Sequence, residues 1–180
     1  SLNFGTGGMG GPDFGKSKCL LAWSRNPFHT STPIVRRLLD AREKGMKIID
    51  VGPLITPLTA YADIHLRFRP GTSGALALGM AHIIIEEGLY DREFVENYTL
   101  GFEEYRDYVR EFPPGVTGEI TGVSGSKIIE AAGIIVDGAI ACHGQRVDGE
   151  VAPLGIGFPI AAEFNFGMPA KCFDILAQRC

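Results

Sequence analysis

The first third of the chain alternates between strand-like, helix-like and strand-like patterns, and this alternation constrains the fold more than any other feature. Lys18–Trp23 (KCLLAW) is a short apolar run with polar neighbours, which is typical of a buried strand. A helical pattern capped by Thr32 follows and ends at Gly45, before a second strand-like run at Lys47–Val51 (KIIDV). Residues 18–51 thus have the length of about 34 residues that is usual for a β-α-β unit. The sequence therefore predicts an α/β fold with a parallel sheet.

Later patterns extend this alternation. Asp63–Phe68 alternates like a third strand, and Gly74–Glu87 is helical and apolar nearly all round. Such a helix must be covered on most sides, and because so short a chain offers little cover, we expect an exposed apolar surface on the isolated chain. Three more helices and a fourth strand are expected at Asp91–Asn97, Gly101–Glu111, Ser124–Ala132 and Ala139–His143. This order of elements favours helices on both faces of the sheet.

The pattern divides the chain into three parts. Residues 1–17 form a glycine-rich loop, residues 18–145 form the α/β domain, and residues 146–180 form an irregular segment that glycine and proline interrupt repeatedly. The net charge of −4 argues against a nucleic-acid partner, and no apolar run approaches the length of a membrane span. The four scattered cysteines form no C-x-x-C pair, which argues against a zinc or iron–sulfur site built from this chain alone.

Ligands of parallel α/β sheets bind beyond the carboxyl ends of the strands, so the loops that follow strands hold the candidate binding residues. The loop after the first strand places Ser24, Arg25 and Asn26 before a helix N-terminus, which suits a phosphate or another anion. The alternative is that this loop is only a turn with a helix cap. The loop after the third strand could receive a base or a phosphate, or could again be an ordinary turn and cap. Its candidates are Arg69, Gly71, Thr72 and Ser73.

The other two strand ends leave alternatives open. Asp50 near the end of the second strand is either a nucleotide contact or a polar residue on an exposed strand face, and Gly52 occupies the tip. After the expected fourth strand, His143 lies next to Gly144 and Gln145, and it could be a general acid–base group, a ligand or a structural residue. The sequence contains no G-x-G-x-x-G that opens a helix after a strand, no P-loop and no G-x-S-x-G, which weakens a nicotinamide, kinase or hydrolase function.

Taken together, these loops resemble a known family. WSRNPFHTSTP resembles the W-G-x-N-P loop of the dimethyl sulfoxide reductase family of molybdopterin oxidoreductases. Two later segments, ADIHLRFRPGTSGALALGMAHIIIEEGLYDREFVENYTLGFEEYRDYV and TGVSGSKIIEAA, resemble the same family in order and spacing. The resemblance covers roughly residues 13–145, and residues 146–180 match poorly. It implies a Rossmann-like central domain that binds the guanosine end of one of two molybdopterin guanine dinucleotides.

The resemblance also places residues by position. It implies that the first loop lies by the phosphates or ribose, that the third loop lies by the guanine, and that the loop from His143 to Arg146 faces the pterins. The cofactor-binding residues expected in this way are Ser24, Arg25, Asn26, His29, Asp50, Gly52, Arg69, Gly71, Thr72, Ser73, His143 and Gln145.

Two departures from the family pattern fall within these loops. The Asp-Pro-Arg that the family usually has after the second strand reads Gly52-Pro53-Leu54 here. The family's Pro-Gly-Thr-Asp reads Pro-Gly-Thr-Ser at residues 70–73, so one hydroxyl replaces a carboxylate that could bind both guanine N–H donors. Losing such a charge-assisted pair costs about 1.5–3 kcal/mol.

The resemblance implies that most of the enzyme lies outside this chain. The expected cofactors of the parent are bis(molybdopterin guanine dinucleotide) with molybdenum or tungsten and an iron–sulfur cluster in an N-terminal domain; no metal ligand is expected here. The expected partners are the other domains of the parent subunit and an electron-transfer subunit, in the cytoplasm or periplasm of a bacterium or archaeon, with the cytoplasm favoured. The parent would transfer electrons or oxygen atoms, whereas this truncated chain alone would be inactive. The alternatives are a scaffold or interaction module that has lost nucleotide binding, and a non-redox hydratase of the same family.

Overall fold

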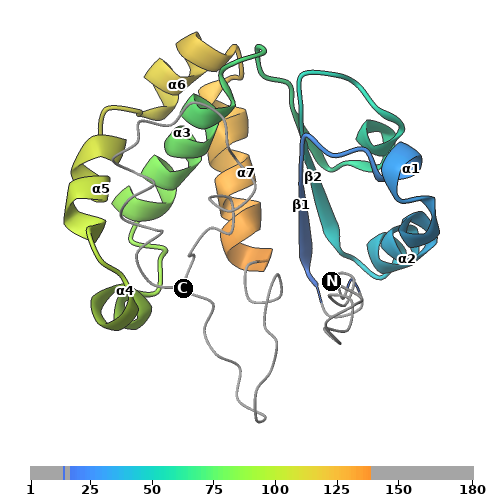
Figure 1. Cartoon of the computed structure of the whole chain (residues 1–180), viewed down its shortest axis with the longest axis horizontal. Helices are drawn as coiled ribbons and strands as arrows, with labels where there is room; N and C mark the ends of the chain where they lie inside the picture. The colour runs from blue at the N-terminus through green and yellow to red at the C-terminus, as the bar shows by residue number, and fades with distance from the viewer. Residues whose placement is uncertain (1–13, 15–16, 139–180) are drawn as a thin grey trace, which may run out of the picture.

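The computed structural model describes residue 14 and residues 17–138, and these residues form three layers (Figure 1). A parallel sheet stands in the middle, with one group of helices on each face. The sheet contains β1 (Cys19–Trp23), β2 (Lys47–Val51) and β3 (Ile64–Leu66) in the order β1-β2-β3. The α/β fold with a parallel sheet and helices on both faces is confirmed.

The register of the sheet brings the carboxyl ends of all three strands to one edge. Trp23 pairs with Val51, and Val51 pairs with Leu66. The expected strand at Lys18–Trp23 begins one residue later, and the expected strand at Asp63–Phe68 is shortened to Ile64–Leu66. Because the last residues of the strands are neighbours, the loops that follow them are neighbours as well.

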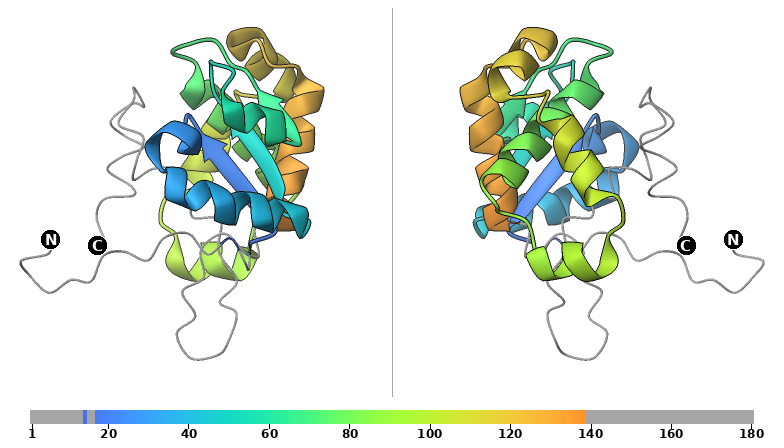
Figure 2. Two further views of the ribbon diagram at one scale, coloured as in Figure 1. Left: turned by 90° about the vertical axis from the view of Figure 1, so that its right-hand side faces the viewer. Right: turned by 90° about the vertical axis from the view of Figure 1, so that its left-hand side faces the viewer.

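One face of the sheet is covered by α2 (Thr32–Glu43), as Figure 2 shows in its left view, together with the short α1 (Pro27–Thr30) and the 3₁₀ helix η2 (Pro57–Tyr61). Leu38 and Ala41 of α2 pack with Ala22 and Ile48 of the strands in one buried cluster. Ser31, not Thr32, is the N-cap of α2, and no side chain caps this helix, so the expected cap at Thr32 is wrong. The helix ends before Gly45, whose φ of 100° is the left-handed turn that the sequence predicts there.

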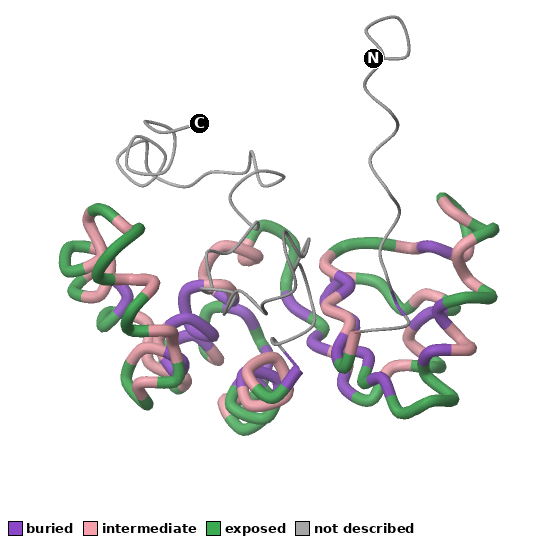
Figure 3. The backbone as a smooth tube through the Cα atoms, turned by 90° about the horizontal axis from the view of Figure 1, so that it is seen from below, coloured by how far each residue is buried: buried purple, intermediate pink, exposed green. Residues whose placement is uncertain are grey.

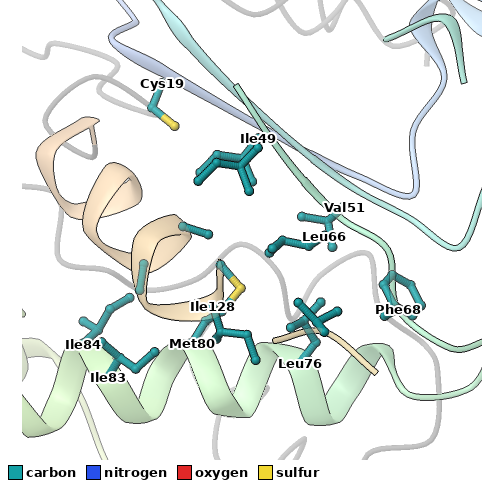
Figure 4. Close-up of a cluster of buried hydrophobic side chains, with 14 residues drawn as sticks. Cys19, Ile49, Val51, Leu66, Phe68, Leu76, Met80, Ile83, Ile84 and Ile128 are labelled. Carbon is teal, nitrogen blue, oxygen red and sulfur yellow. The ribbon is translucent and has the colours of Figure 1, made fainter. Parts of the chain in front are cut away.

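The opposite face is covered by α3 (Ser73–Glu86) and α7 (Gly125–Gly138). Figure 4 shows Ile49, Val51 and Leu66 projecting from the sheet toward Met80 and Ile128 of these helices. Side chains of this size each contribute about 1.5–3 kcal/mol when they are fully buried. This cluster holds the sheet against α3 and α7.

The apolar helix α3 is covered by this chain itself, contrary to the expectation of an exposed surface. Helices α5 (Phe102–Val109), α6 (Pro114–Thr121) and α7 pack around it, and α4 (Arg92–Tyr98) lies beyond α5 (Figure 1). The apolar side chains of α3 are all buried or half-buried. Figure 3 shows buried stretches through the interior and exposed residues on the outer turns. The expected apolar patch on α3 is therefore wrong.

Two helices were absent from the sequence expectations. The loop after β1 contains the single turn α1, and residues 114–121 form α6 in spite of Gly115 and Gly118. The expected strand at Ala139–His143 lies outside the described residues, as do most of residues 1–17 and all of residues 146–180. Within residue 14 and residues 17–138, no helix has both the length and the hydropathy needed to cross a membrane.

Candidate functional site

The candidate site is the edge of the sheet where the strands end, which lies at the top of Figure 1. Three loops meet there because Trp23, Val51 and Leu66 are neighbours in the register. The first loop follows β1, the second follows β2, and the third runs from Arg67 to the start of α3. The prediction that candidate residues gather at the carboxyl ends is consistent with this arrangement.

A side-chain hydrogen bond ties the first loop to the third. The indole Nε1–H of Trp23, the last residue of β1, donates to Ser73 Oγ across 2.8 Å. Ser73 is the first residue of α3, and both side chains are half-buried. Sequence reasoning included Ser73 but did not identify Trp23. The signal that could have found it is an indole as the last residue of an apolar strand, where its N–H needs an acceptor.

Ser24 adopts a backbone conformation that is unusual for a residue with a side chain. Its φ is 49°, and among the described residues other than glycine it alone has a positive φ. Its N–H donates to Val51 O across 2.6 Å, which holds this turn against the end of β2. Strained backbone of this kind gathers at functional sites, where the surrounding structure maintains it. The strain therefore points to the first loop as more than a connection.

Asn26 contributes a buried polar atom that no other described residue satisfies. Its backbone carbonyl accepts from the N–H groups of His29 and Thr30 at 3.1 and 3.0 Å, but its side-chain Oδ1 is buried and has no hydrogen-bond partner in residue 14 or residues 17–138. A buried polar atom that lacks a partner is costly unless a ligand or water satisfies it. Arg25 and His29, the other candidates of this loop, are exposed.

The candidates at the end of β2 are engaged within the protein. Asp50 is 2% exposed, so it does not lie on an exposed strand face; its Oδ2 accepts from Thr59 Oγ1 at 2.6 Å. The Nε2 of His65 lies 4.0 Å from the same oxygen. Gly52 is buried, and its N–H donates to Leu66 O at 3.2 Å. Thr59 was not foreseen, because its role depends on how η2 folds over the strand.

The third loop divides into an engaged part and an open part. Arg69 turns toward α6, where its Nη1 donates to Glu119 O at 2.8 Å, and its own N–H donates to Thr121 O. Thr72 Oγ1 donates to Arg69 O at 2.7 Å, so it does not cap α3. Gly71 has a φ of 86°, and a Cβ built there would meet no atom within 4 Å. The open part of this loop is thus Gly71 and the uncapped first turn of α3.

Two candidates, His143 and Gln145, lie outside the described residues. Within the described part of the chain, no group of three His, Cys, Asp or Glu side chains could hold a metal ion. A cavity of about 210 Å³ lies at the opposite, amino-terminal edge of the sheet, beside Lys18, Lys44 and Met46, and it is therefore separate from the candidate site.

Comparison with known proteins shows which family this chain is similar to. The family described as "Molybdopterin oxidoreductase" matches residues 5–153. The chain is 38% identical over 136 residues to the F420-dependent formate dehydrogenase subunit alpha of Methanocaldococcus jannaschii, and the match covers 74% of this chain and 20% of that protein. It is 40% identical over 107 residues to formate dehydrogenase H of Escherichia coli, covering 59% of this chain and 15% of that protein.

A solved structure shares both the sequence and the fold. Acetylene hydratase from Pelobacter acetylenicus is 41% identical, with a TM-score of 0.64, and the match covers 69% of this chain and 17% of that one. The chain thus spans about a fifth or less of the length of each of these relatives.

Proposed function

The chain belongs to the molybdopterin oxidoreductase family, and on that premise we propose that it binds the guanosine end of a molybdopterin guanine dinucleotide as one domain of a larger subunit. The observation that supports this most directly is the meeting of three loops at one sheet edge, with the Trp23–Ser73 hydrogen bond joining the first to the third. In a parallel α/β sheet, this edge is where a nucleotide has access to loop backbone and helix N-termini.

The residues at this edge fit a nucleotide in three respects. The first-turn N–H groups of α3 have no side-chain cap, and Gly71 leaves the backbone beside them open. Arg25 supplies an exposed positive charge for a diphosphate. The buried Asn26 Oδ1 has no hydrogen-bond partner among the described residues and can accept from a ribose hydroxyl. These features supply donors, charge and an acceptor in one place.

Each loop has a distinct role in this proposal. Ser24, Arg25 and Asn26 contact phosphate or ribose, and Gly71, Thr72 and Ser73 lie by the base. Arg69 acts indirectly, because its guanidinium holds the C-terminus of α6 beside the third loop. Asp50 holds η2 over β2 through Thr59 and supports the second loop in the same indirect way. His29, Gly52, His143 and Gln145 complete the proposed set.

The reaction belongs to the whole subunit. A bound molybdopterin with molybdenum or tungsten would supply electron or oxygen-atom transfer, while the residues described here orient its nucleotide end. The proposed partners are the remaining domains, one with an iron–sulfur cluster, and an electron-transfer subunit. We infer that the 180-residue chain alone is inactive, because it spans only about a fifth or less of the length of the relatives that it matches.

A second candidate is hydration at the metal without net redox change. The acetylene hydratase structure favours it, since that protein is as similar to this chain as the formate dehydrogenases are. The choice between the two reactions would be made by residues outside the described edge.

A thermal-shift titration with GDP tests the proposed binding. We expect the midpoint of unfolding to rise with GDP concentration, as mass action requires for a ligand of the folded state. Arg25→Ala and Asn26→Ala should each weaken the effect. Arg36→Ala is the matched control, because Arg36 is exposed on α2 and pairs with Asp40 at 2.9 Å. No shift with GDP at any concentration would leave instead a scaffold that has lost its nucleotide.

A further inference from the structure

We propose that His65 is a positioning residue that couples nucleotide binding at this edge to the uptake of a proton. When the imidazole is protonated, it pairs with the buried carboxylate of Asp50, and the edge then binds an anionic diphosphate more tightly. This inference rests on the proposed function, since it concerns the regulation of the same site. It goes further because it assigns that regulation to two side chains that do not themselves contact the nucleotide.

The two residues are neighbours in the sheet, one residue before the strands end. Asp50 pairs with His65 in the register of β2 and β3, and Ala22 of β1 completes the row. Residues opposite each other in neighbouring strands point to the same face of a sheet, and Ala22 belongs to the buried cluster beneath α2. The carboxylate of Asp50 is therefore buried under the helical cover, about 3.3 Å along the chain from the end of β2.

The charge of the Asp50 carboxylate has little compensation. The hydrogen bond that the described residues give it comes from a neutral donor, Thr59 Oγ1, at 2.6 Å from Oδ2. A carboxylate bound in this way keeps most of its negative field, because burial removes the water that would screen it. A diphosphate beyond the strand ends is also negative, so the carboxylate opposes its binding.

His65 holds the group that can remove this repulsion. Its Nε2 is buried, lies 4.0 Å from Asp50 Oδ2, and has no hydrogen-bond partner among the described residues. Histidine is the side chain that ordinarily gains its charge as the pH falls from about 8 to about 5. A proton on Nε2 supplies a donor and a positive charge, and a shift of about 1 Å brings the nitrogen within hydrogen-bond range of the carboxylate.

The other charged or titratable side chains around this imidazole are engaged elsewhere. Asp63 and Arg67 follow it on the same side of β3; Asp63 pairs with Lys47 at 2.9 Å, and Arg67 donates to a backbone carbonyl of the second loop at 3.3 Å. From α2, Arg42 donates to the backbone carbonyl of Tyr61 at 2.7 Å, and the ring of Tyr61 in η2 stacks on an aromatic side chain of α1. The carboxylate of β2 is therefore the charged group with which the imidazole can pair.

The coupling between the proton and the nucleotide works in both directions. If a proton on His65 favours the diphosphate, a bound diphosphate must favour that proton by the same factor. We expect a factor of about ten, which is typical of coupled sites. Nucleotide affinity should thus fall as the pH rises through the range in which histidine titrates, and binding should take up protons.

Isothermal titration calorimetry of the full 180-residue chain with GDP-mannose tests both consequences. GDP-mannose carries guanosine diphosphate as a diester, so it lacks the proton that titrates at about pH 6 in a phosphate monoester. We expect its dissociation constant to be about tenfold lower at about pH 5.5 than at about pH 8. Titrations in two buffers that differ in their enthalpy of protonation should show that protons are taken up from the buffer.

Two variants test the assignment to these side chains. Asp50→Asn removes the charge but keeps an acceptor for Thr59, and it should bind GDP-mannose at about pH 8 nearly as tightly as the parent does at about pH 5.5. A residue needed only for the fold would not gain affinity when it is replaced. His65→Gln should bind equally at both pH values and take up no protons. His82→Gln is the matched control, because His82 lies on α3 with its Nδ1 3.1 Å from Val109 O, and it should keep the pH dependence of the parent.

The outcomes separate the inference from the proposed function. If GDP-mannose binds at neither pH, both the proposed function and the inference fail. Equal affinity at the two pH values would leave nucleotide binding intact and overturn the inference. A pH dependence that persists in His65→Gln would also overturn it, because another group, such as the exposed His29 of the first loop, would then be titrating. So would a folded Asp50→Asn variant that binds no more tightly than the parent at about pH 8.

Discussion

Thr59 Oγ1 donates a 2.6 Å hydrogen bond to Asp50 Oδ2, and this contact joins the 3₁₀ helix η2 to a carboxylate buried in the sheet. The same hydroxyl oxygen accepts from the backbone N–H of Thr56, the N-cap of η2, at 3.0 Å. One side chain therefore binds both the start of η2 and the carboxylate of Asp50. A buried carboxylate is tolerated only when hydrogen bonds compensate for its lost hydration.

Removing the Thr59 hydroxyl should therefore destabilise the protein more than the loss of a surface threonine would. Thr59→Val keeps the shape of the side chain but leaves Asp50 without this donor, and we expect a loss of about 2–3 kcal/mol in the free energy of unfolding. Urea denaturation followed by circular dichroism measures it. Thr59→Ser keeps the hydroxyl and should cost less than half as much; equal losses for both variants would contradict the role of the hydrogen bond.

Gly79, where α3 contacts α6, is a second position at which a substitution should destabilise the protein. A Cβ built on Gly79 would lie 2.4 Å from Thr117 Oγ1, and Thr117 is fully buried. Gly79→Ala should therefore cost about 1–3 kcal/mol through overpacking, in spite of the better helix propensity of alanine.

Gly133 in α7 is the matched control for that substitution. A Cβ there would meet no atom within 4 Å, so Gly133→Ala should stabilise the chain by up to about 1 kcal/mol. Adding Thr117→Gly to Gly79→Ala should recover part of the loss. Chemical denaturation of the parent, the two single variants and the double variant measures these free energies of unfolding. If Gly79→Ala were more stable than the parent, α3 and α6 would have to move apart without cost.

The sequence predicts the central frame of the fold because that frame depends on local patterns. β1 and β2 coincide with two apolar runs, and the left-handed turn at Gly45 ends α2 as expected. Helix α6 was not predicted, because its glycines lower helix propensity and its stability comes from contact with α3. The sequence also does not predict which helices cover α3, because these tertiary contacts leave no periodic pattern in the sequence.

The sequence predicts at which edge of the sheet the candidate residues lie, but not which side chains they contact. Strand order places the three loops at one edge, and sequence alone locates Ser24, Asp50 and Ser73 near it. The partners Trp23 and Thr59 depend on distances across loops that residue spacing does not encode. The same holds for Arg69, whose guanidinium contacts α6.

Ser24 has a left-handed backbone, and replacing it with glycine should stabilise the protein rather than destabilise it. Its φ of 49° is unfavourable for a residue with a Cβ, by about 1 kcal/mol relative to glycine. Ser24→Gly should therefore raise the free energy of unfolding by about that amount. Ser31→Gly is the control, because the φ of Ser31 is −152° and relieves no strain there. Thermal unfolding compares the two, and a Ser24→Gly variant no more stable than the parent would show that the side chain compensates for its backbone.

Asp63 gives the chain a contribution to stability that should be lost in acid. Burial alone would raise the pKa of its carboxyl, but the hydrogen bond from Ile48 N and the ammonium of Lys47, both at 2.9 Å, outweigh burial and hold the pKa below its ordinary value. A carboxyl whose pKa is lowered in the folded state stabilises the protein above the unfolded-state pKa of about 3.9, and the contribution disappears as the pH falls through the lower folded pKa.

Asp63→Asn should therefore be less stable than the parent at pH 7, and the difference should narrow as the pH falls below about 4. Lys47→Met removes the ammonium but keeps the Ile48 contact, so it should show a smaller effect with the same pH direction. Urea denaturation at a series of pH values measures the difference, and a gap between Asp63→Asn and the parent that widens in acid would contradict the lowered pKa.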